Sequence, residues 1–556
     1  MKFKDMPYTR PDMKAVEATY KKLTQEQRDA KSAEEAFAVH KKYYEFSDEL
    51  GTAFELAMIR HTIDTADEFY DKENDFFDEV SPLISNWDNA YKKALYESPF
   101  RPELEKIIGK VAFKNIEVAL KAFDESIIDL MQEENALVSR YDKLIASAKI
   151  EFEGETYNLS MMRPFLTDVD RSRRKAAWAA VSAYMESVTG EIDDIYDRLV
   201  KNRTEQARRM GYKDFVELGY YRMGRNCYGR EDVENFRKQV KESFMPLVKK
   251  IQKNIEQRLE IKDGLKLYDY DVYLKEGSPK PIGTPEEILE KGRRLYHELS
   301  TETGVFFDFM MENELFDVLG RKNKQQGGYM TYIPKYKSPF IFANFNGTEG
   351  DVDVITHESG HAFQGYIVGN NEEIREFAEI GMETAEIHSM SMEYFTEPWM
   401  EMFFGDRADD YRTLHLESGI SFIPYGCMVD EFQHIVYSHP EMSPAERKET
   451  WKKLEHIYRP HIDFDGSIME EAYWQRQGHI FQVPFYYIDY VLASVCALQF
   501  AVRMKEDYKG AWADYLKLCG MSAKDFYVNM LPQCGLNVPF ADGTVSALAA
   551  ALSKWI

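Results

Sequence analysis

Residues 327–364 read GGYMTYIPKYKSPFIFANFNGTEGDVDVITHESGHAFQ, and within them the pattern of the chain changes twice. The first part is rich in aromatic and β-branched residues, with Gly and Pro at its edges. This composition predicts two or three short strands, at 328–333 and 339–345, that form a small sheet. Apolar residues at helical spacing follow from about residue 351, and Gly369 with the two asparagines after it offers an end to that helix.

The expected helix carries an H-E-x-x-H motif at residues 357–361. On a helix, His357 and His361 lie one turn apart on one face, so their imidazoles can bind the same Zn²⁺ ion. Glu358 is rotated by about 100° from His357, so it flanks the metal and stands where a general base is needed. The alternative is an amphipathic helix whose two histidines are packed or exposed without a metal.

Two aspartates lie near the start of this expected helix. Asp351 with Thr348 resembles a capping box, in which each residue satisfies a backbone amide of the other. Asp353 is one turn before His357 and could accept the second ring N–H of that imidazole, which would fix its tautomer. A solvated aspartate in the first turn of a helix is the alternative interpretation of Asp353.

A catalytic zinc site needs a third protein ligand and one open position. The next expected helix, GMETAEIHSMSMEYF at 381–395, is rich in carboxylates. Glu386, Ser389 and Glu393 fall on one face of it. His388 is a rival ligand by its chemistry, but it projects about 200° away from Glu386. Spacing alone does not choose among the available carboxylates, which are Glu379, Glu383, Glu386 and Glu393.

The rest of the chain is mainly helical by its pattern of apolar residues. Glycine is scarce in residues 1–200, which we expect to form an N-terminal helical lobe, with a small hairpin at 151–160 as its main interruption. The segment 263–285 holds Gly, Pro and several Tyr and is the best candidate for a linker. Residues 201–556 then form the region that carries the motif.

Composition excludes several classes of protein. The chain has 556 residues, with 70 Lys and Arg against 95 Asp and Glu, and a net charge of −25 that repels nucleic acid and anionic lipid. No apolar run reaches the roughly 18 residues of a membrane span, and the first residues hold no apolar segment, so we expect no secretory signal. Five cysteines, never spaced C-x-x-C, argue against a disulfide framework and indicate a reducing cytoplasm.

Three blocks of the sequence together resemble a known family. Residues 339–364 and 383–395, followed by HIFQVPFYYIDYVLAS at 479–494, are similar to the M3 metallopeptidases, especially the oligoendopeptidase F branch. The blocks occur in the order of that family and at roughly its spacing. The resemblance covers about 190–556 well and the N-terminal region more loosely.

The resemblance implies a mainly α fold, namely a multi-helical, two-lobed peptidase with a deep central channel and a small β-sheet beside the zinc-binding helix. It implies that His357, His361 and Glu386 bind one Zn²⁺ per chain. Glu358 matches the catalytic glutamate of the family. In this interpretation Glu386 is the ligand among the four carboxylates that spacing leaves open.

The third block implies further catalytic residues. His479, Tyr487 and Tyr490 resemble the residues that hold the substrate and stabilise the transition state, and a slip of one residue would exchange Tyr487 with Tyr486. A tyrosine hydroxyl can donate to an oxyanion while it stays neutral at pH 7, although an aromatic core stripe is the alternative for such a block. The strand at 340–345 resembles the one whose edge pairs with the substrate backbone, through Phe342, Ala343 and Asn344.

The function implied is that of a zinc-dependent oligoendopeptidase, which hydrolyses internal bonds of short peptides with Glu358 as general base. We expect a cytoplasmic monomer that has short peptides as partners and binds neither nucleic acid nor membrane. One alternative is a zinc carboxypeptidase or dipeptidase. The other is a non-catalytic, metal-stabilised peptide-binding protein, which would not need an intact Glu358.

Overall fold

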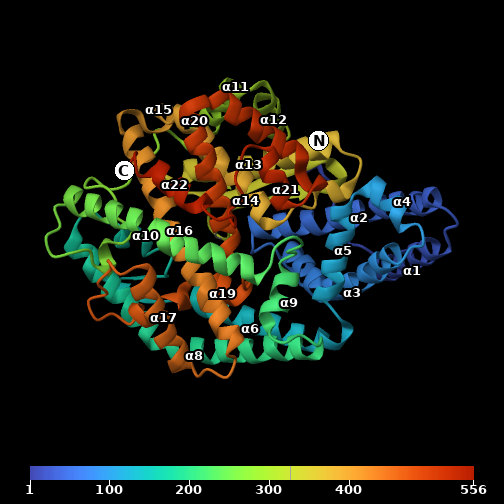
Figure 1. Ribbon diagram of the computed structural model, residues 1–556, viewed down its shortest axis with the longest axis horizontal. Helices are drawn as coiled ribbons and strands as arrows, with labels where there is room; N and C mark the ends of the chain where they lie inside the picture. The colour runs from blue at the N-terminus through green and yellow to red at the C-terminus, as the bar shows by residue number, and fades with distance from the viewer. Residues whose placement is uncertain (326) are drawn as a thin grey trace. The chain divides into compact units, whose positions relative to one another are not determined.

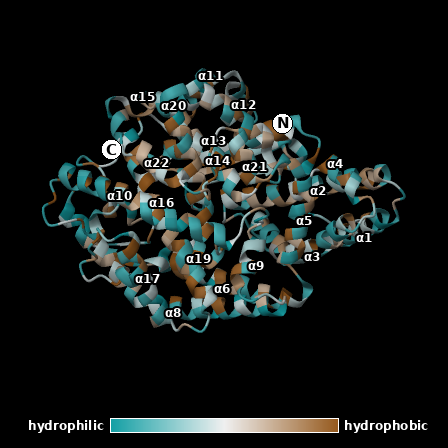
Figure 2. Cartoon of the chain, viewed as in Figure 1, coloured by the Kyte–Doolittle hydropathy of each residue, from teal (hydrophilic) through white to brown (hydrophobic). Residues whose placement is uncertain are grey.

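The computed structural model describes residues 1–325 and 327–556, and it is mainly helical, as expected (Figure 1). The chain forms two compact units. The first unit consists of residues 1–121, 280–408 and 503–536, and the second of residues 122–279, 409–502 and 537–556. Figure 2 shows that most helices carry both hydrophilic and hydrophobic residues, as helices with one buried side do.

This division differs from the one expected at residue 200. Residues 1–121 belong to the same compact unit as the segment with the H-E-x-x-H motif, because the N-terminal helices pack on that segment. The segment 263–285 does contain one of the passages between units, at residues 279 and 280. The chain passes between the units more than once, so no single cut along the sequence separates them.

The first unit opens with the helices α1 (Met13–Asp29), α2 (Ala33–Ile63), α3 (Glu68–Tyr96), α4 (Arg101–Ile108) and α5 (Lys110–Ala122). Asp12, Ser32 and Asp67 accept hydrogen bonds from first-turn amides of α1, α2 and α3, which explains where these helices begin. The core between them is a cluster of apolar side chains contributed by all three helices, namely Val16, Tyr20, Leu23, Val39 and Tyr91.

A three-stranded sheet also belongs to the first unit. Its strands are β3 (Phe316–Leu319), β4 (Tyr329–Ile333) and β5 (Ser338–Phe345), in the order β3-β5-β4. β5 runs parallel to β3 and antiparallel to β4. The two expected strands are therefore present, whereas β3 lies in a stretch expected to be helical. Four residues carry too little periodicity to identify a strand, and β3 owes its conformation to its ladder with β5.

The remaining helices of the first unit come before or after these strands in the sequence. They are α11 (Pro285–Leu299), α12 (Thr301–Glu312), α13 (Gly350–Asn371), α14 (Met382–Phe395), α15 (Glu401–Phe404) and α21 (Tyr527–Gln533). α13 follows β5 directly and packs on both β5 and β4, so the small sheet lies beside the helix with the motif, as expected.

The expected capping box at the start of α13 is not formed. The Asp351 carboxylate instead accepts the backbone amides of Asn346 and Gly347, at 2.9 and 2.8 Å. These amides belong to the loop that leads from β5 into α13, and satisfying them fixes the entry of the helix without help from the Thr348 side chain. The helix ends at Asn371, close to the end that Gly369 and the two asparagines indicated.

The second unit is built from α6 (Ile128–Ala146), α7 (Arg163–Leu166), α8 (Arg171–Arg209), α9 (Phe215–Arg222), α10 (Arg230–Arg258), α16 (Ala408–Ser438), α17 (Pro444–Tyr458), α18 (Met469–Ala472), α19 (Gly478–Gln482) and α22 (Thr544–Leu552). The expected hairpin is present as β1 (Ile150–Phe152) and β2 (Glu155–Tyr157), paired antiparallel. Glu153 and Gly154 join the strands with φ of 52° and 88°, as a type I′ turn requires.

One long apolar helix, α20 (Tyr487–Met521), is interrupted at Asp507, where φ and ψ leave the helical region. Residues 487–502 belong to the second unit and residues from 503 on to the first. The span Tyr487–Lys524 has the length and composition of a membrane helix, but 72% of its most apolar window is buried inside the protein. The core helix of a soluble protein has the same properties.

Candidate metal centre and active site

The site is built on the contact between α13 and α14, which a glycine makes possible. A Cβ atom at Gly360 would lie 2.4 Å from the carbonyl oxygen of His388 and 2.6 Å from Cα of Ser389. Both neighbours are backbone atoms, which cannot move aside cheaply. Glycine within the H-E-x-x-H motif therefore lets the backbones of the two helices approach, and this approach brings their polar faces together.

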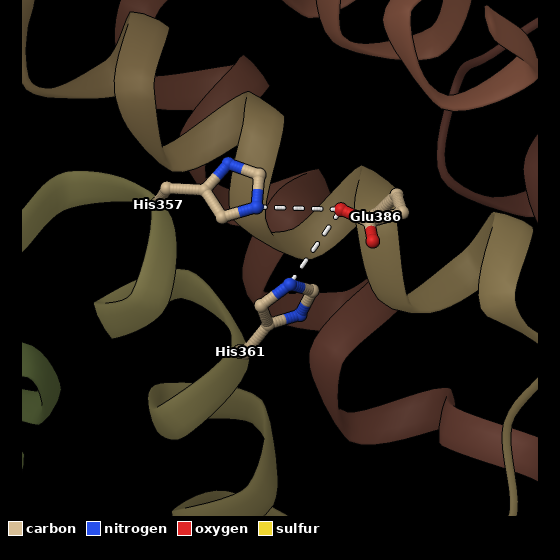
Figure 3. A group of neighbouring side chains, drawn as sticks. All are labelled: His357, His361 and Glu386. Carbon is tan, nitrogen blue, oxygen red and sulfur yellow. Dashed lines mark ion pairs between the residues drawn. The ribbon is translucent and has the colours of Figure 1, made fainter. Parts of the chain in front are cut away.

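Three potential metal ligands meet across this contact (Figure 3). Oε2 of Glu386, from α14, lies 3.4 Å from Nε2 of His357 and 3.6 Å from Nε2 of His361, both from α13. All three ligand atoms lie within 4.8 Å of one another. Tetrahedral zinc with bonds of 2.0–2.1 Å separates its ligand atoms by about 3.3–3.4 Å, so these residues fit a zinc ion.

The electrostatics of Glu386 suit a ligand. Its carboxylate is buried, and burial opposes its ionisation, but hydrogen bonds and positive charge from His357 and His361 outweigh this and hold its pKa well below the usual range. Ser389 Oγ donates to Oε2 of Glu386 at 3.0 Å. The carboxylate is thus charged and held from a second side before any metal binds.

The other nitrogen of the His357 ring is held by Glu393, and the prediction for Asp353 is wrong in this respect. Nδ1 of His357 lies 2.6 Å from Oε1 of Glu393. Glu393 is two turns after Glu386 on α14, so it faces α13 together with the ligand. A carboxylate that accepts the Nδ1 proton favours the tautomer whose Nε2 is available to bind a metal ion.

Glu358 lies between the two histidines in sequence, and its side chain is 9% exposed. Burial raises its pKa, the charges of His357 and His361 lower it, and the carboxylates of Glu386 and Glu393 raise it again. The net effect is a raised pKa for Glu358. A raised pKa means that this buried carboxyl holds a proton more readily than an exposed one, which suits a group that takes up a proton and returns it.

The other candidate ligands lie outside this group. Among the residues that the structure describes, His357, His361 and Glu386 form the cluster able to hold a metal ion. His388 is fully buried, its Nδ1 meets the carbonyl of Thr384 at 3.1 Å, and burial lowers its pKa to about 3. Burial raises the pKa of Glu379, whose charged neighbours include Lys92 and Glu376 rather than the two histidines.

The predicted substrate edge of 340–345 is not open. β5 is the central strand, and Ile341 and Phe342 pair with β3 on one side and with β4 on the other. The carbonyl of Ala343 accepts a hydrogen bond from Lys324 Nζ, and Asn344 Nδ2 donates to the carbonyls of Gln325 and Gly327. Because β5 lies between the other two strands, the open edges of the sheet belong to β3 and β4.

The histidine and tyrosines of the third sequence block come together in the second unit. The ring of His479, on α19, lies 5.2–5.8 Å from the rings of Tyr486, Tyr487 and Tyr490 at the start of α20. Buried Arg203 and Arg225 donate to the carbonyls of Phe481 and Phe485 and so hold the connection between α19 and α20. Both Tyr486 and Tyr487 contact His479, so their separate roles stay predictions.

A buried polar network ties the N-terminal helices to the segment between α13 and α14. Glu376, in a 3-10 turn at Arg375–Ala378, accepts hydrogen bonds from Nε2 of His40 at 2.6 Å and from Tyr44. Nδ1 of His40 meets the hydroxyl of Tyr91 at 2.8 Å. The sequence holds no signal for this network, because His40 and Glu376 are 336 residues apart. Helices α2 and α3 thus hold the segment that leads to Glu386.

Comparison with known proteins places these residues in a family. The model of the family described as Peptidase family M3 matches residues 165–529, and the model of the Peptidase M3 N-terminal domain matches residues 3–123. The oligoendopeptidase F homolog of Borreliella burgdorferi is 20% identical over 538 residues, which is 89% of this chain and 86% of that protein.

Solved structures agree over the whole chain. A candidate oligoendopeptidase F is 45% identical with a TM-score of 0.94, and covers 100% of this chain and 98% of that one. PZ peptidase A with an inhibitor is 44% identical with a TM-score of 0.94, and the match covers 100% of this chain and 99% of that one. A candidate oligoendopeptidase F from Bacillus anthracis is 42% identical with a TM-score of 0.90, and the match covers 100% of this chain and 98% of that one. The chain therefore belongs to peptidase family M3, in its oligoendopeptidase F branch, and is a metalloendopeptidase.

Proposed function

We propose that this protein is a zinc-dependent oligoendopeptidase that hydrolyses internal bonds of short peptides, with Glu358 as general base. The observation that carries the proposal is the meeting of His357, His361 and Glu386, with ligand atoms within 4.8 Å of one another beside the buried Glu358. A structural metal site needs no such base, so this combination supports a catalytic role.

The ligand set favours zinc. Two imidazole nitrogens and one carboxylate oxygen are the ligands of many catalytic zinc sites, and the distances from the Glu386 oxygen to the two nitrogens are close to those of a tetrahedral site. When bound, zinc would act as a Lewis acid towards the peptide carbonyl and would lower the pKa of a water molecule towards about 7. We propose one zinc per chain, held by His357, His361 and Glu386.

Glu358 would move the proton. It takes a proton from the water that attacks the peptide carbonyl and delivers it to the nitrogen of the leaving amine. Its burial and raised pKa support both halves of this transfer, because a carboxyl that is too acidic would not hold the proton long enough to return it. Glu393 would keep the tautomer of His357 constant during the reaction.

His479, Tyr487 and Tyr490 would stabilise the oxyanion that develops on the carbonyl. Each can donate a hydrogen bond, and loss of one such donor costs about 3 kcal/mol in typical enzymes. Burial raises the pKa of Tyr487 well above its usual value, so its hydroxyl keeps its proton at neutral pH and remains a donor. Tyr486, adjacent to Tyr487, would contact the substrate.

The substrate backbone would pair with β4 in place of the closed strand at 340–345. β4 is an edge strand, and among the described residues its ladder partner is β5 alone. Its Tyr332 packs against Gly365 and Gly369 of α13, the helix that carries the two histidines. An extended peptide added to this edge would be recognised through its main chain, which predicts broad tolerance for side chains.

The names of the similar proteins, oligoendopeptidase and PZ peptidase, support short peptides as substrates. We further propose that the protein acts in the cytoplasm as a monomer and binds neither nucleic acid nor membrane. The net charge of −25 and the five cysteines, never spaced C-x-x-C, support this setting.

The test is cleavage of an internally quenched peptide of about eight residues with both ends blocked. We expect chelation to stop internal cleavage, zinc to restore it, and mass spectrometry to place the cut away from either end. Trimming of free-ended peptides without cleavage of the blocked one would favour a zinc carboxypeptidase or dipeptidase instead. Glu358→Gln serves as the control for contaminating peptidases.

A further inference from the structure

A chain of three polar side chains leads to the ring of His479. The hydroxyl of Tyr425, on α16, lies 2.9 Å from Oε1 of Gln477. Nε2 of the same amide lies 3.0 Å from Nδ1 of His479. All three residues belong to the second unit. Gln477 therefore bridges a buried tyrosine and the histidine that resembles a catalytic residue.

We propose that Gln477, oriented by Tyr425, sets the tautomer of His479 with its proton on Nε2, and so makes this ring a neutral hydrogen-bond donor. Gln477 is a positioning residue in this proposal, because it acts on the substrate only through His479. The inference rests on the proposed function in one respect, namely that His479 acts on the substrate.

The orientation of the amide follows from the tyrosine. A tyrosine hydroxyl carries one proton, and when it is buried that proton needs an acceptor. Tyr425 is 6% exposed, and among the described contacts Gln477 is the partner of its hydroxyl. The amide oxygen must then face Tyr425, which turns the NH₂ group towards His479.

The tautomer of His479 follows from the amide. An NH₂ group only donates, so Nδ1 of His479 must be the acceptor and must lack a proton. A neutral imidazole has one proton, which then resides on Nε2. Such a nitrogen donates to a carbonyl oxygen or oxyanion and cannot take a proton from water. Glu358 is thereby left as the base, and His479 joins the tyrosines as a donor.

Tyr425 and Gln477 are themselves held in place. The guanidinium of Arg459 lies 4.8 Å from the ring centre of Tyr425, and Tyr487 packs against the same ring at 5.9 Å. The backbone N–H of Gln477 donates to the carbonyl of Trp474 at 2.9 Å, and its own carbonyl accepts the N–H of Ile480 at 3.0 Å. Gln477 thus sits at the start of α19, fixed two residues before the ring it orients.

The direct test is NMR of the full chain labelled with ¹⁵N-histidine, because ring shifts distinguish Nδ1–H from Nε2–H. The His479 signals are identified by their loss in His479→Gln. We expect wild-type His479 to carry its proton on Nε2 and Gln477→Glu to show a protonated Nδ1, because a carboxylate only accepts. A wild-type ring with its proton on Nδ1 would overturn the proposal.

Kinetics test the consequence. We expect Gln477→Glu to lower kcat by about 10²-fold, as loss of one oxyanion donor does, with KM changed less than about threefold. Gln477→Met and Tyr425→Phe should lower kcat by about tenfold each, since the tautomer is then favoured less strongly. Gln482→Met, an exposed change on the same short helix, is the matched control and should act like wild type. Wild-type kcat in Gln477→Glu would overturn the proposal.

Activity of His479→Gln separates failure of the proposed function from failure of the proposal for Gln477. If His479→Gln turns over like wild type, His479 does not act on the substrate and the catalytic half of the proposal fails with it, whatever the tautomer. If His479→Gln loses activity while Gln477→Glu keeps it, the role of His479 stands and that of Gln477 is wrong. Zinc content should be equal in all these variants, since none alters His357, His361 or Glu386.

Discussion

Oε1 of Glu393 lies 2.6 Å from Nδ1 of His357 and accepts its proton. Glu393 stands on α14 two turns after Glu386. One face of α14 therefore supplies both Glu386, a candidate metal ligand, and the carboxylate that orients His357, another candidate ligand. The two helices act as one preorganised unit, because any shift of α14 along α13 would disturb both contacts at once.

The first prediction concerns this pair. Glu393→Ala should weaken zinc binding by about 10- to 100-fold, because His357 loses the partner that fixes its tautomer. Glu393→Gln should lose less, since the amide oxygen can still accept the N–H. Competition with a chromogenic chelator measures both. Asp353→Asn is the control and should bind zinc as wild type does; a larger loss there than in Glu393→Ala would contradict the assignment.

The second prediction concerns the third ligand. Glu386→Ala should abolish tight zinc binding, because the two histidines alone leave the site with too few ligands. Glu383→Gln, three residues earlier on the same helix, should keep one zinc per chain. The zinc content of the dialysed Glu386→Ala and Glu383→Gln proteins measures the difference. Stoichiometric zinc in Glu386→Ala would show that another carboxylate completes the site.

The third prediction concerns the base. Glu358→Gln should keep the zinc and lose about 10³-fold or more in kcat, because the amide cannot take a proton. Retained metal separates this effect from loss of the site. A variant that binds zinc and still turns over within tenfold of wild type would remove Glu358 as the base.

The fourth prediction concerns the helix contact. Gly360→Ala should destabilise the protein by about 1–3 kcal/mol and weaken zinc binding, because the added methyl group meets the backbone of His388 and Ser389. Gly190→Ala, in α8, is the matched control: nothing lies within 4 Å of its Cβ position, so a gain of about 0.4–1 kcal/mol is expected. Denaturation curves with and without zinc compare the two.

The fifth prediction concerns the segment before α14. Glu376→Ala should cost about 3 kcal/mol or more and weaken zinc binding, because His40 and Tyr44 lose their buried partner. Glu17→Gln removes an exposed i,i+4 ion pair on α1 and should cost less than about 0.5 kcal/mol. Equal zinc affinity in Glu376→Ala and wild type would show that the N-terminal helices do not support the site.

The same carboxylate predicts a pH dependence. Burial opposes ionisation of Glu376, but the hydrogen bond and charge of His40 and the hydrogen bond of Tyr44 outweigh it and lower its pKa. A lowered folded-state pKa contributes stability at pH above the unfolded value, and this contribution is lost as pH falls through the folded value. The difference in unfolding free energy between wild type and Glu376→Ala should therefore shrink in acid.

The local features of this protein follow from its sequence. A spacing of four residues places His357 and His361 on one face of a helix, and aromatic and β-branched residues with Gly and Pro at their edges identify β4 and β5. These signals are local because the hydrogen bonds and turns that they reflect join near neighbours in the chain. The resemblance to the M3 family added Glu386, where spacing left four carboxylates open.

Only the tertiary structure decided how distant residues meet. It placed Glu393 rather than Asp353 on His357, made β5 a central strand with no open edge, and brought His40 of α2 to Glu376. It also joined residues 1–121 to the unit with the metal ligands. Each of these contacts joins residues that are far apart in sequence, and it depends on which helices and strands pack together, which no local pattern of residues encodes.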